Sequence, residues 1–479
     1  MHMLLDDDAK TVGRPSEYRF NLLYIWMISA IAALGGLLFG YDWVVIGGAK
    51  PFYEPYFHLT SEAQIGWANS CALLGCLLGS MASGVLSDRI GRKALLIVAA
   101  ALFGVSSVAT GWAHHFDSFV AWRILGGVAI GIASNVSPTY IAEVAPAQWR
   151  GRLVTLNQLT IVVGILGAQI VNLLIAGHVE DGLSAEAVRG SWQGQFGWRW
   201  MFTAVAIPSL IFFVSAFFVP ESPRWLIKNG AKEKAMAVLA RIGGADYAEA
   251  EIGSIEAGLS RERTQRGAWG ELLRPTVLGL LMIGIGLAVL QQWSGTNVIF
   301  NYAEDIYRGA GYDLSGVMFN IVITGAINLV FTLVATVTVD RLGRRALMLW
   351  GTATIAILHG LLGAAFYFHV TGPLVLILTL AVIAAYATSL APVTWVLLSE
   401  IFPNRIRGVA MSIAVSALWI ACFAVTYTFP ILNRSLGAAG TFWCYGAFCF
   451  AGLLFIVFTV PETSGKSLEE IEARLTSKS

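Results

Sequence analysis

Two ionisable residues, Asp42 and Arg123, lie inside long apolar stretches of the sequence. An Asp or Arg near the centre of a membrane helix costs about 3 kcal/mol or more, so each residue requires an explanation. Their side chains carry opposite charges and can form an ion pair, and the carboxyl group can also be protonated. A static ion pair between two helices, or an aspartate near enough to the membrane surface to be solvated, would explain the same two residues.

A second group of residues offers hydrogen bonds without charge. Gln291, Gln292 and Asn297 lie in one apolar stretch, and amides supply both the donors and the acceptors that a hydroxyl-rich ligand requires. On a straight helix Gln292 and Asn297 would point about 140° apart, so they share one cavity only if the helix bends. Gly295, between them, permits that bend. A polar seam between two packed helices is the alternative interpretation.

A polar stripe follows another apolar stretch. Gln169 and Asn172 lie within about 40° of Gln158 around a helix, on either side of it. Because a polar stripe that faces lipid would be costly, we expect it to face a cavity or a neighbouring helix. Gln169 and Asn172 are interpreted as the lining of an outer vestibule.

The elements that position these residues must be membrane helices. Hydrophobic residues make up 56% of the 479 residues, charged residues 13%, and the mean hydropathy is +0.68, values typical of a chain whose solvent is a bilayer. Helices satisfy their own backbone hydrogen bonds in lipid, and the pattern does not alternate as barrel strands would. The apolar stretches predict twelve spans: 22–46, 65–86, 94–113, 117–141, 153–176, 199–219, 276–300, 315–338, 346–369, 373–397, 409–431 and 439–460.

The chain contains an internal repeat, visible where apolar stretches end. The run SDRIGRK at 87–93 returns as VDRLGRR at 339–345, and PES at 220–222 returns as PET at 461–463. Glu143 and Arg150 have counterparts in Glu400 and Arg407, in similar surroundings. The chain is therefore a duplicated membrane unit, and such units commonly form transporters with a site between the halves.

The distribution of Lys and Arg predicts the orientation. With the N-terminus inside, 25 of the 31 Lys and Arg residues fall in cytoplasmic segments, as the positive-inside rule requires. Both termini are therefore expected to be cytoplasmic. The predicted divisions are a cytoplasmic tail at 1–20, a six-helix bundle at 21–220, a cytoplasmic linker with short surface helices at 221–275, a second six-helix bundle at 276–461 and a cytoplasmic tail at 462–479.

Other classes of function lack their residue patterns. The five cysteines lie in predicted spans, without a CxxC pair or a ligand set that includes His. We find no nucleophile and base set, no phosphate-binding loop and no basic patch for nucleic acid, since basic and acidic residues interleave in the linker. The sequence predicts a protein that is not an enzyme and that needs no metal or cofactor.

Longer motifs carry a family resemblance. The run GVLSDRIGR at 84–92, its repeat and the twelve spans resemble the major facilitator superfamily. The runs PESPRWL at 220–226, QQWSGTN at 291–297 and LSEIFP at 398–403 are similar to the sugar porter family, especially its bacterial xylose and hexose proton symporters. The resemblance covers residues from about 30 to 470. It implies an all-α integral membrane fold, with twelve transmembrane helices in two pseudo-symmetric six-helix bundles.

The resemblance also implies the function. Sugar porters of this type are secondary active transporters that import a monosaccharide by proton symport through alternating access. Asp42 and Arg123 match the pair that carries the coupling proton: Arg123 holds the ionised Asp42, and protonation loosens the pair. The residues expected to bind substrate by this resemblance are Phe39, Gln158, Gln291, Gln292, Asn297, Asn301, Trp395 and Trp419.

The sequence departs from the family pattern near the sugar. Leu418 and Cys422 stand where relatives commonly place amides, Asn301 stands where the first of two tyrosines is usual, and Ala391 replaces a common glycine. A missing partner leaves a substrate hydroxyl unpaired, at about 1 to 3 kcal/mol. A less polar wall fits a pentose or another less hydroxylated sugar, and a polyol such as inositol is a further alternative.

Repeated charges are expected on the cytoplasmic side. They resemble the family's inner salt-bridge network, a gate that biases the equilibrium between outward and inward states. The pairs expected are Asp88 with Arg92, Glu143 with Arg150, Asp340 with Arg344 and Glu400 with Arg407, joined by Glu221 and Arg224. Basic residues placed only by the positive-inside rule would leave the adjacent acids unexplained. His359 and His369 are expected in an outer supporting helix rather than in a proton relay.

The sequence thus predicts a monomeric multi-pass protein of the cell membrane, whose partners are a sugar, a proton and the lipid bilayer and do not include nucleic acid. A facilitative uniporter or a polyol transporter on the same scaffold is the nearest alternative. A sugar sensor that does not transport is a third, but it would use a longer cytoplasmic extension to pass on its signal.

Overall fold

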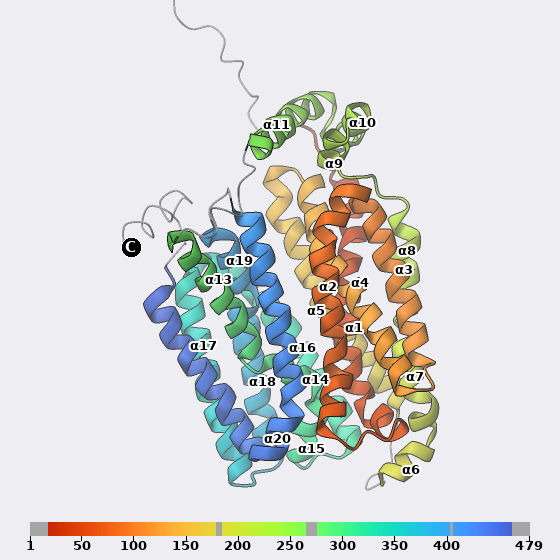
Figure 1. Ribbon diagram of the computed structural model, residues 1–479, viewed down its shortest axis with the longest axis vertical. Helices are drawn as coiled ribbons and strands as arrows, with labels where there is room; N and C mark the ends of the chain where they lie inside the picture. Colours follow the sequence, from red (N-terminus) through yellow and green to blue (C-terminus); the bar gives the residue numbers. More distant parts are fainter. Residues whose placement is uncertain (1–17, 179–183, 265–274, 403–405, 462–479) are drawn as a thin grey trace, which may run out of the picture.

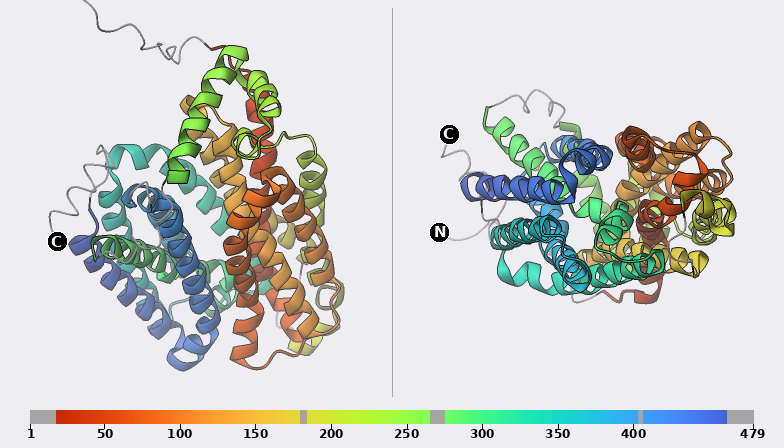
Figure 2. Two further views of the ribbon diagram at one scale, coloured as in Figure 1. Left: turned by 45° about the horizontal axis from the view of Figure 1, so that its top comes forward. Right: turned by 90° about the horizontal axis from the view of Figure 1, so that it is seen from below.

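The computed structural model describes residues 18–178, 184–264, 275–402 and 406–461, and over these residues its regular elements are helices (Figure 1). Helices of the first half form one bundle: α1 Leu22–Tyr56, α2 Glu62–Ile90, α3 Arg92–Gly111, α4 Phe116–Val144, α5 Ala147–Ala176, α6 Ala185–Gly190, the π-helical turn η1 Gln193–Gly197, α7 Trp198–Thr203 and α8 Ala206–Ala216. Helices of the second half form the other: α13 Pro275–Trp293, α14 Thr296–Asn301, α15 Ala303–Gly309, α16 Leu314–Leu342, α17 Arg344–Tyr367, α18 Pro373–Thr388, α19 Leu390–Ile401 and α20 Arg407–Thr459. Figure 2 shows the two bundles side by side.

The prediction of an all-helical membrane fold is confirmed. Eleven helical stretches in the described part of the chain are long and apolar enough to cross a membrane. One of them, α20, contains two spans, because Gly437 interrupts it with φ 68° and ψ 173°. The stretches therefore account for all twelve predicted spans. Several helices run past the predicted limits; α1 continues to Tyr56, ten residues beyond the expected end of the first span.

Two spans are broken near their middle. The seventh span consists of α13 and α14, separated at Gly295, whose φ of 81° is left-handed. Glycine adopts this conformation without the steric penalty of a Cβ atom. The bend predicted at Gly295 is thus confirmed. The tenth span consists of α18 and α19, separated at Ser389. Broken spans present backbone and side-chain polar groups to the interior of a bundle.

Close helix packing depends on small residues. At the crossing of α1 and α5, a Cβ atom on Gly40 would collide with the carbonyl oxygen of Ile161, and one on Gly164 with the carbonyl oxygen of Leu37. Without a hydrophobic driving force between helices in lipid, such backbone contact is a main source of packing energy. It fixes α1, and with it Asp42, against α5.

Three short helices cover one end of the first bundle: α9 Pro223–Lys228, α10 Lys232–Gly243 and α11 Ala245–Thr264 (Figure 1). We call this the α10 end; the distribution of Lys and Arg predicts that it faces the cytoplasm. The opposite end carries the last turn of α1, with α6 and α15, and is predicted to face outward.

Candidate functional site

The structure brings Asp42 of α1 and Arg123 of α4 into contact. Nη1 of Arg123 lies 3.2 Å from Oδ1 and 3.1 Å from Oδ2 of Asp42, and 3.4 Å from its carbonyl oxygen. Both side chains are only 3% exposed. The guanidinium group also lies over the ring of Phe202, 5.4 Å from its centroid, which favours the cation.

The chemistry of this pair follows from its burial. A buried ion pair repays its desolvation only while both charges are present, and removal of one charge from a buried pair costs about 3 to 5 kcal/mol. Neutralising Asp42 by protonation would therefore leave Arg123 as an uncompensated charge. The contact of α1 with α4 at this depth thus includes one carboxyl group and one guanidinium group that are buried together.

The amides of the broken seventh span form a connected group. Gln291 donates from Nε2 to the carbonyl oxygens of Leu390 and Ala391, each at 3.2 Å. Gln292 donates to Oε1 of Gln291 at 3.1 Å, and Asn297 donates to Oε1 of Gln292. The orientation of such amides follows from the hydrogen-bond network. The bend at Gly295 has brought Asn297 back towards Gln292, so three amides from both sides of the break meet.

Aromatic residues border this group from both bundles. Phe39 of α1 and Trp419 of α20 lie with ring centroids 6.1 Å apart. The indole nitrogen of Trp419 is buried and has no hydrogen-bond partner among the described residues. Buried polar groups usually have a partner, which a ligand hydroxyl can provide. Trp419 therefore combines an apolar face with an available donor at the boundary between the bundles.

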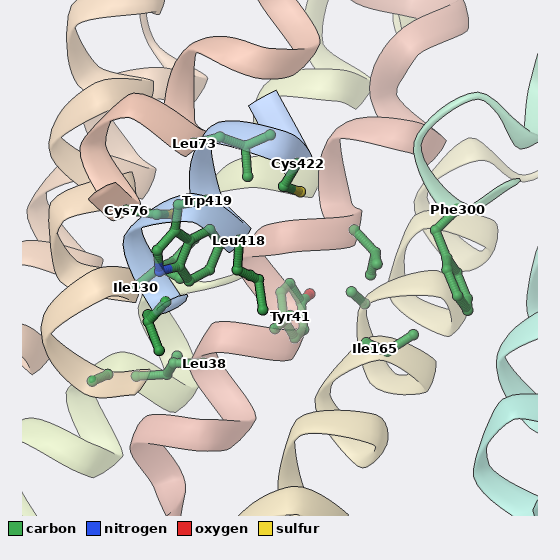
Figure 3. Packing of buried hydrophobic residues seen from close by; sticks show 14 of the residues in the cluster. Leu38, Tyr41, Leu73, Cys76, Ile130, Ile165, Phe300, Leu418, Trp419 and Cys422 are labelled. Atoms are coloured by element: carbon green, nitrogen blue, oxygen red, sulfur yellow. The ribbon is translucent and has the colours of Figure 1, made fainter. Parts of the chain in front are cut away.

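Two of the residues that depart from the family pattern, Leu418 and Cys422, lie beside these groups. Leu418 is 3% exposed and Cys422 is 2% exposed. Sγ of Cys422 lies 3.5 Å from Nδ2 of Asn297, so Cys422 faces the amide group. Figure 3 shows Leu418, Trp419 and Cys422 in one group of buried side chains with Tyr41 of α1.

The remaining predicted binding residues lie at different depths. Trp395 of α19 is 39% exposed, and Gln158 of α5 is half-buried. Asn301, at the last residue of α14, is buried against Gly47 of α1, and its Oδ1 has no partner among the described residues. Asn301 is therefore at the contact of α1 with the seventh span, one helical turn after Asn297 in α14.

Gln169 and Asn172, interpreted as the lining of an outer vestibule, are buried in this structure. Nδ2 of Asn172 donates to the carbonyl oxygen of Val45 in α1 at 3.0 Å. Gln169 is buried where α5 meets Gly325 of α16. These two residues of the polar stripe on α5 thus face neighbouring helices. A polar stripe that faces lipid would be costly, and a neighbouring helix was one of the two environments expected for it, the other being a cavity.

The charges at the α10 end of the first bundle form a compact network around Arg92. Its guanidinium group makes two contacts with Glu143, Nε to Oε2 and Nη2 to Oε1, both at 2.9 Å, and one with Asp88 at 3.2 Å. Oε1 of Glu221 accepts the backbone N–H groups of Arg92 at 2.9 Å and Lys93 at 3.2 Å. A carboxylate is favoured there because these N–H groups open α3.

The second bundle repeats the main contact of this network, with Arg344 3.5 Å from Glu400. The predicted pairing of Glu143 with Arg150 and of Glu400 with Arg407 therefore differs from the structure. Arg150 is exposed, and Nε of Arg407 donates to the carbonyl oxygen of Phe402 at 3.3 Å. Glu143 and Glu400 each lie in the last turn of a helix, and Arg150 and Arg407 each lie in the first turn of the next helix. The chain turns between the two helices, so the glutamate and the arginine side chains point in different directions. Arg224 lies in the first turn of α9, and the side chain of Asp340 is outside the described set.

Sequence reasoning missed two polar residues, one that contacts the seventh span and one that contacts the helix α15 that follows it. Nε2 of His359, from α17, lies 2.7 Å from the carbonyl oxygen of Ser294, at the break beside Gly295. Lys50, near the end of α1, lies 2.8 Å from Glu304 of α15. The signal for His359 is a histidine inside an apolar span. The signal for Lys50 is a lysine that is followed one helical turn later by a glutamate, Glu54.

Comparison with known proteins agrees with this geometry. Residues 28–475 match the family described as Sugar (and other) transporter. The chain is 39% identical to the D-xylose-proton symporter of Escherichia coli (strain K12), over 95% of this chain and 96% of that protein. It is 38% identical to the arabinose-proton symporter of Bacillus subtilis (strain 168), over 96% of each. It is 40% identical to the glucose transport protein of Synechocystis sp., over 95% of this chain and 99% of that one.

The fold also matches solved structures. The xylose transporter XylE from E. coli, in its inward open conformation, superposes with a TM-score of 0.83 and 38% sequence identity, covering 94% of this chain and 99% of that one. Another structure of the same transporter is described as that of a major facilitator superfamily symporter. Sequence and fold therefore agree on a multi-pass membrane protein, and the chain belongs to the sugar transporter family of the major facilitator superfamily.

Proposed function

We propose that this protein imports a monosaccharide together with a proton by alternating access. The observation that carries the proposal is the buried pair of Asp42 and Arg123, 3.1 Å apart, in the interior of the first bundle. The names of two relatives, a D-xylose-proton symporter and an arabinose-proton symporter, support it.

Coupling follows from the cost of an unpaired buried charge. Asp42 takes up a proton from the outer side and becomes neutral, so Arg123 loses its counter-ion and the contact between α1 and α4 weakens. The helices then rearrange around Arg123, and the proton leaves to the inner side, where Asp42 ionises and the pair re-forms. Each cycle requires one protonation and one deprotonation, which couples transport to the proton gradient.

The sugar binds between the bundles. Gln291, Gln292 and Asn297 supply donors and acceptors for its hydroxyl groups, and their present bonds to one another are exchanged for bonds to the sugar. The rings of Phe39 and Trp419 cover its apolar C–H face. Asn301, Gln158 and Trp395 belong to the same proposed site as outlying residues.

The substrate we favour is a pentose. Leu418 and Cys422 make one wall of the site apolar, so an additional hydroxyl group pointing there would lose its hydrogen bonds with water without replacement. Two relatives carry a pentose in their names, and a third is a glucose transport protein. A pentose and a hexose of matched stereochemistry therefore have to be compared directly. We propose that the protein acts as a monomer, with both termini and the α10 end in the cytoplasm.

Uptake into proteoliposomes tests the proposal. Labelled xylose, arabinose, glucose and inositol are offered with and without an inwardly directed proton gradient, and internal sugar is measured over time. We expect accumulation above the external concentration only with the gradient, and fastest for a pentose. Equal internal and external concentrations in both conditions would identify a uniporter instead.

The role of Asp42 is tested in the same assay with Asp42→Asn. This variant should abolish accumulation and leave exchange of labelled for unlabelled sugar measurable, which shows that the site is intact. Asp117→Asn is the matched control, because Asp117 is exposed in the first turn of α4. Full accumulation by Asp42→Asn would remove the basis for proton coupling through this residue.

A further inference from the structure

A buried lysine joins the two bundles at the predicted outer end. Lys50, in the last two turns of α1, is 3% exposed. Its Nζ atom lies 2.8 Å from Oε2 of Glu304 and 2.9 Å from Oδ2 of Asp305. Both acids belong to α15, which follows the broken seventh span in the second bundle (Figure 1). The contact therefore bridges two parts of the chain that must separate if this end opens.

Each side of the bridge has a second partner within its own helix. Oε1 of Glu54, one turn after Lys50 in α1, lies 3.5 Å from the same Nζ atom. On the other side, Nε of Arg308 lies 2.8 Å from Oε1 of Glu304, one turn away in α15. Lys50 and Glu304 would thus each keep an opposite charge if the bridge between them broke.

We propose that Lys50, Glu304 and Asp305 form an outer latch between the bundles, and that the latch opens by exchange of partners. In the closed state Lys50 is shared between α1 and α15. In the open state Lys50 pairs with Glu54 and Glu304 with Arg308. This inference rests on the proposed function in one respect, that transport requires the outer end to open and close.

The exchange gives the latch two defined states. A buried lysine left without a counter-ion would make the open state prohibitive, since unpaired buried charges are strongly unfavourable. Glu54 and Arg308 reduce that penalty, so the two arrangements differ by little enough for both to be populated. A bistable contact of this kind converts a small bias at one site into a change of conformation.

The surroundings of the latch supply water for the exchange. A cavity of about 400 Å³ lies beside it, lined by Lys50, Glu54 and Asp305 together with residues of α2 and α20. The Asp305 side chain is 33% exposed, whereas Glu304 is 9% exposed. Asp305 can therefore be solvated when it releases Lys50, and Glu304 is the acid that needs Arg308.

A second bridge at the same end provides a matched control. Arg434 of α20 lies 2.9 Å from Glu62 of α2, so this pair also joins the bundles, but the Arg434 side chain is 71% exposed. Exposed pairs contribute little because water and salt screen them. Loss of this pair is expected to leave the equilibrium between closed and open states unchanged.

The latch is tested by double electron–electron resonance with spin labels at exposed His115, before α4, and exposed Thr371, before α18, in a background without the five native cysteines. The measured quantity is the ratio of the long to the short distance population, without sugar or proton gradient. Lys50→Gln should raise this ratio about tenfold, a change of about 1.4 kcal/mol. Glu304→Gln with Asp305→Asn should raise it similarly, and Arg434→Gln should leave it unchanged.

The exchange of partners predicts a further result: Glu54→Gln should lower the ratio of the long to the short distance population, whereas Lys50→Gln should raise it. It removes the open-state partner of Lys50, so the long-distance population should fall below the wild-type value and sugar exchange should slow. A passive clamp would show no such fall. An unchanged ratio in both Lys50→Gln and the double variant would overturn the latch. Because this measurement uses no gradient, it can fail while proton-coupled uptake succeeds, and the reverse also holds.

Discussion

The two ends of the molecule use ion pairs in different ways. At the α10 end, Arg92 pairs with Glu143 and Arg344 pairs with Glu400, each within its own bundle. At the opposite end, Lys50 and Arg434 each reach an acid of the other bundle. Charges therefore stabilise each bundle at one end and hold the bundles together at the other.

This difference indicates which end is closed. Ion pairs that cross between the bundles form where the bundles meet, so the predicted outer end is the closed one. The superposition on the inward open conformation of a related transporter, with a TM-score of 0.83, fits that assignment. The contact of Arg92 with Glu143 is repeated as Arg344 with Glu400 in the second half of the chain. In this structure each copy of the pair joins helices of one bundle and does not bridge the two bundles.

The largest expected effect is a loss of protein stability on substitution of Arg92. Arg92→Ala removes the buried partner of Glu143 and should lower the stability of the protein by about 3 to 5 kcal/mol, seen as a lower temperature of thermal unfolding in detergent. Lys228→Gln is the control, because Lys228 forms a half-exposed pair with Asp88 at 2.7 Å and should change stability by about 0 to 1 kcal/mol. Equal losses of stability in the two variants would mean that the buried contacts of Arg92 stabilise the α10 end no more than an exposed ion pair does.

The next effect concerns the amides between the two ends. Gln291→Ala and Asn297→Ala should each weaken sugar binding by about 1 to 3 kcal/mol, because each leaves a hydroxyl group unpaired. Isothermal titration measures the change. Gln195→Ala serves as control, since its amide binds the Arg189 carbonyl oxygen in the α6 and η1 region. Unchanged affinity in both site variants would show that these amides form a packing seam.

A smaller effect is expected at His359. His359→Ala removes the bond to the Ser294 carbonyl oxygen, so the break in the seventh span should be less well fixed and sugar affinity should fall by about 1 kcal/mol. His369→Ala, at the exposed end of α17, should have no such effect. If the two variants bind sugar equally well, the break is held by its backbone alone.

The smallest effect concerns selectivity. Leu418→Gln should improve hexose binding relative to pentose binding, because a buried amide offers a partner to an added hydroxyl group. The expected change is about 1 kcal/mol, measured by titration of both sugars into both proteins. A constant affinity ratio would place Leu418 outside the sugar site, in the packing between α20 and α1.

The sequence predicted the fold well because the bilayer imposes simple rules. Span positions followed from hydropathy, and the bend at Gly295 followed from the angle between Gln292 and Asn297. The contact of Asp42 with Arg123 did not follow in this way. Hydropathy places each residue in a span but does not say which spans touch, so that pairing came from the family resemblance.

The errors have physical causes as well. The family resemblance predicts a pair of Glu143 with Arg150, whereas the turn at Pro146 separates the two residues and α3 presents Arg92 to Glu143 instead. Lys50 lies beyond residue 46, the predicted end of the first span. The helix continues to Tyr56, which buries Lys50 against the other bundle.

The left-handed residue Gly295 has a mechanical consequence. A side chain there would be strained by the backbone conformation and would meet the Tyr445 ring at 3.0 Å. The chain beyond it, α14 and α15, carries Asn297 two residues after Gly295 and Glu304 nine residues after it. If the proposed amide site binds a sugar, a rotation of the chain at Gly295 would move Asn297 and Glu304 together, so occupancy of that site and the position of α15 would be linked.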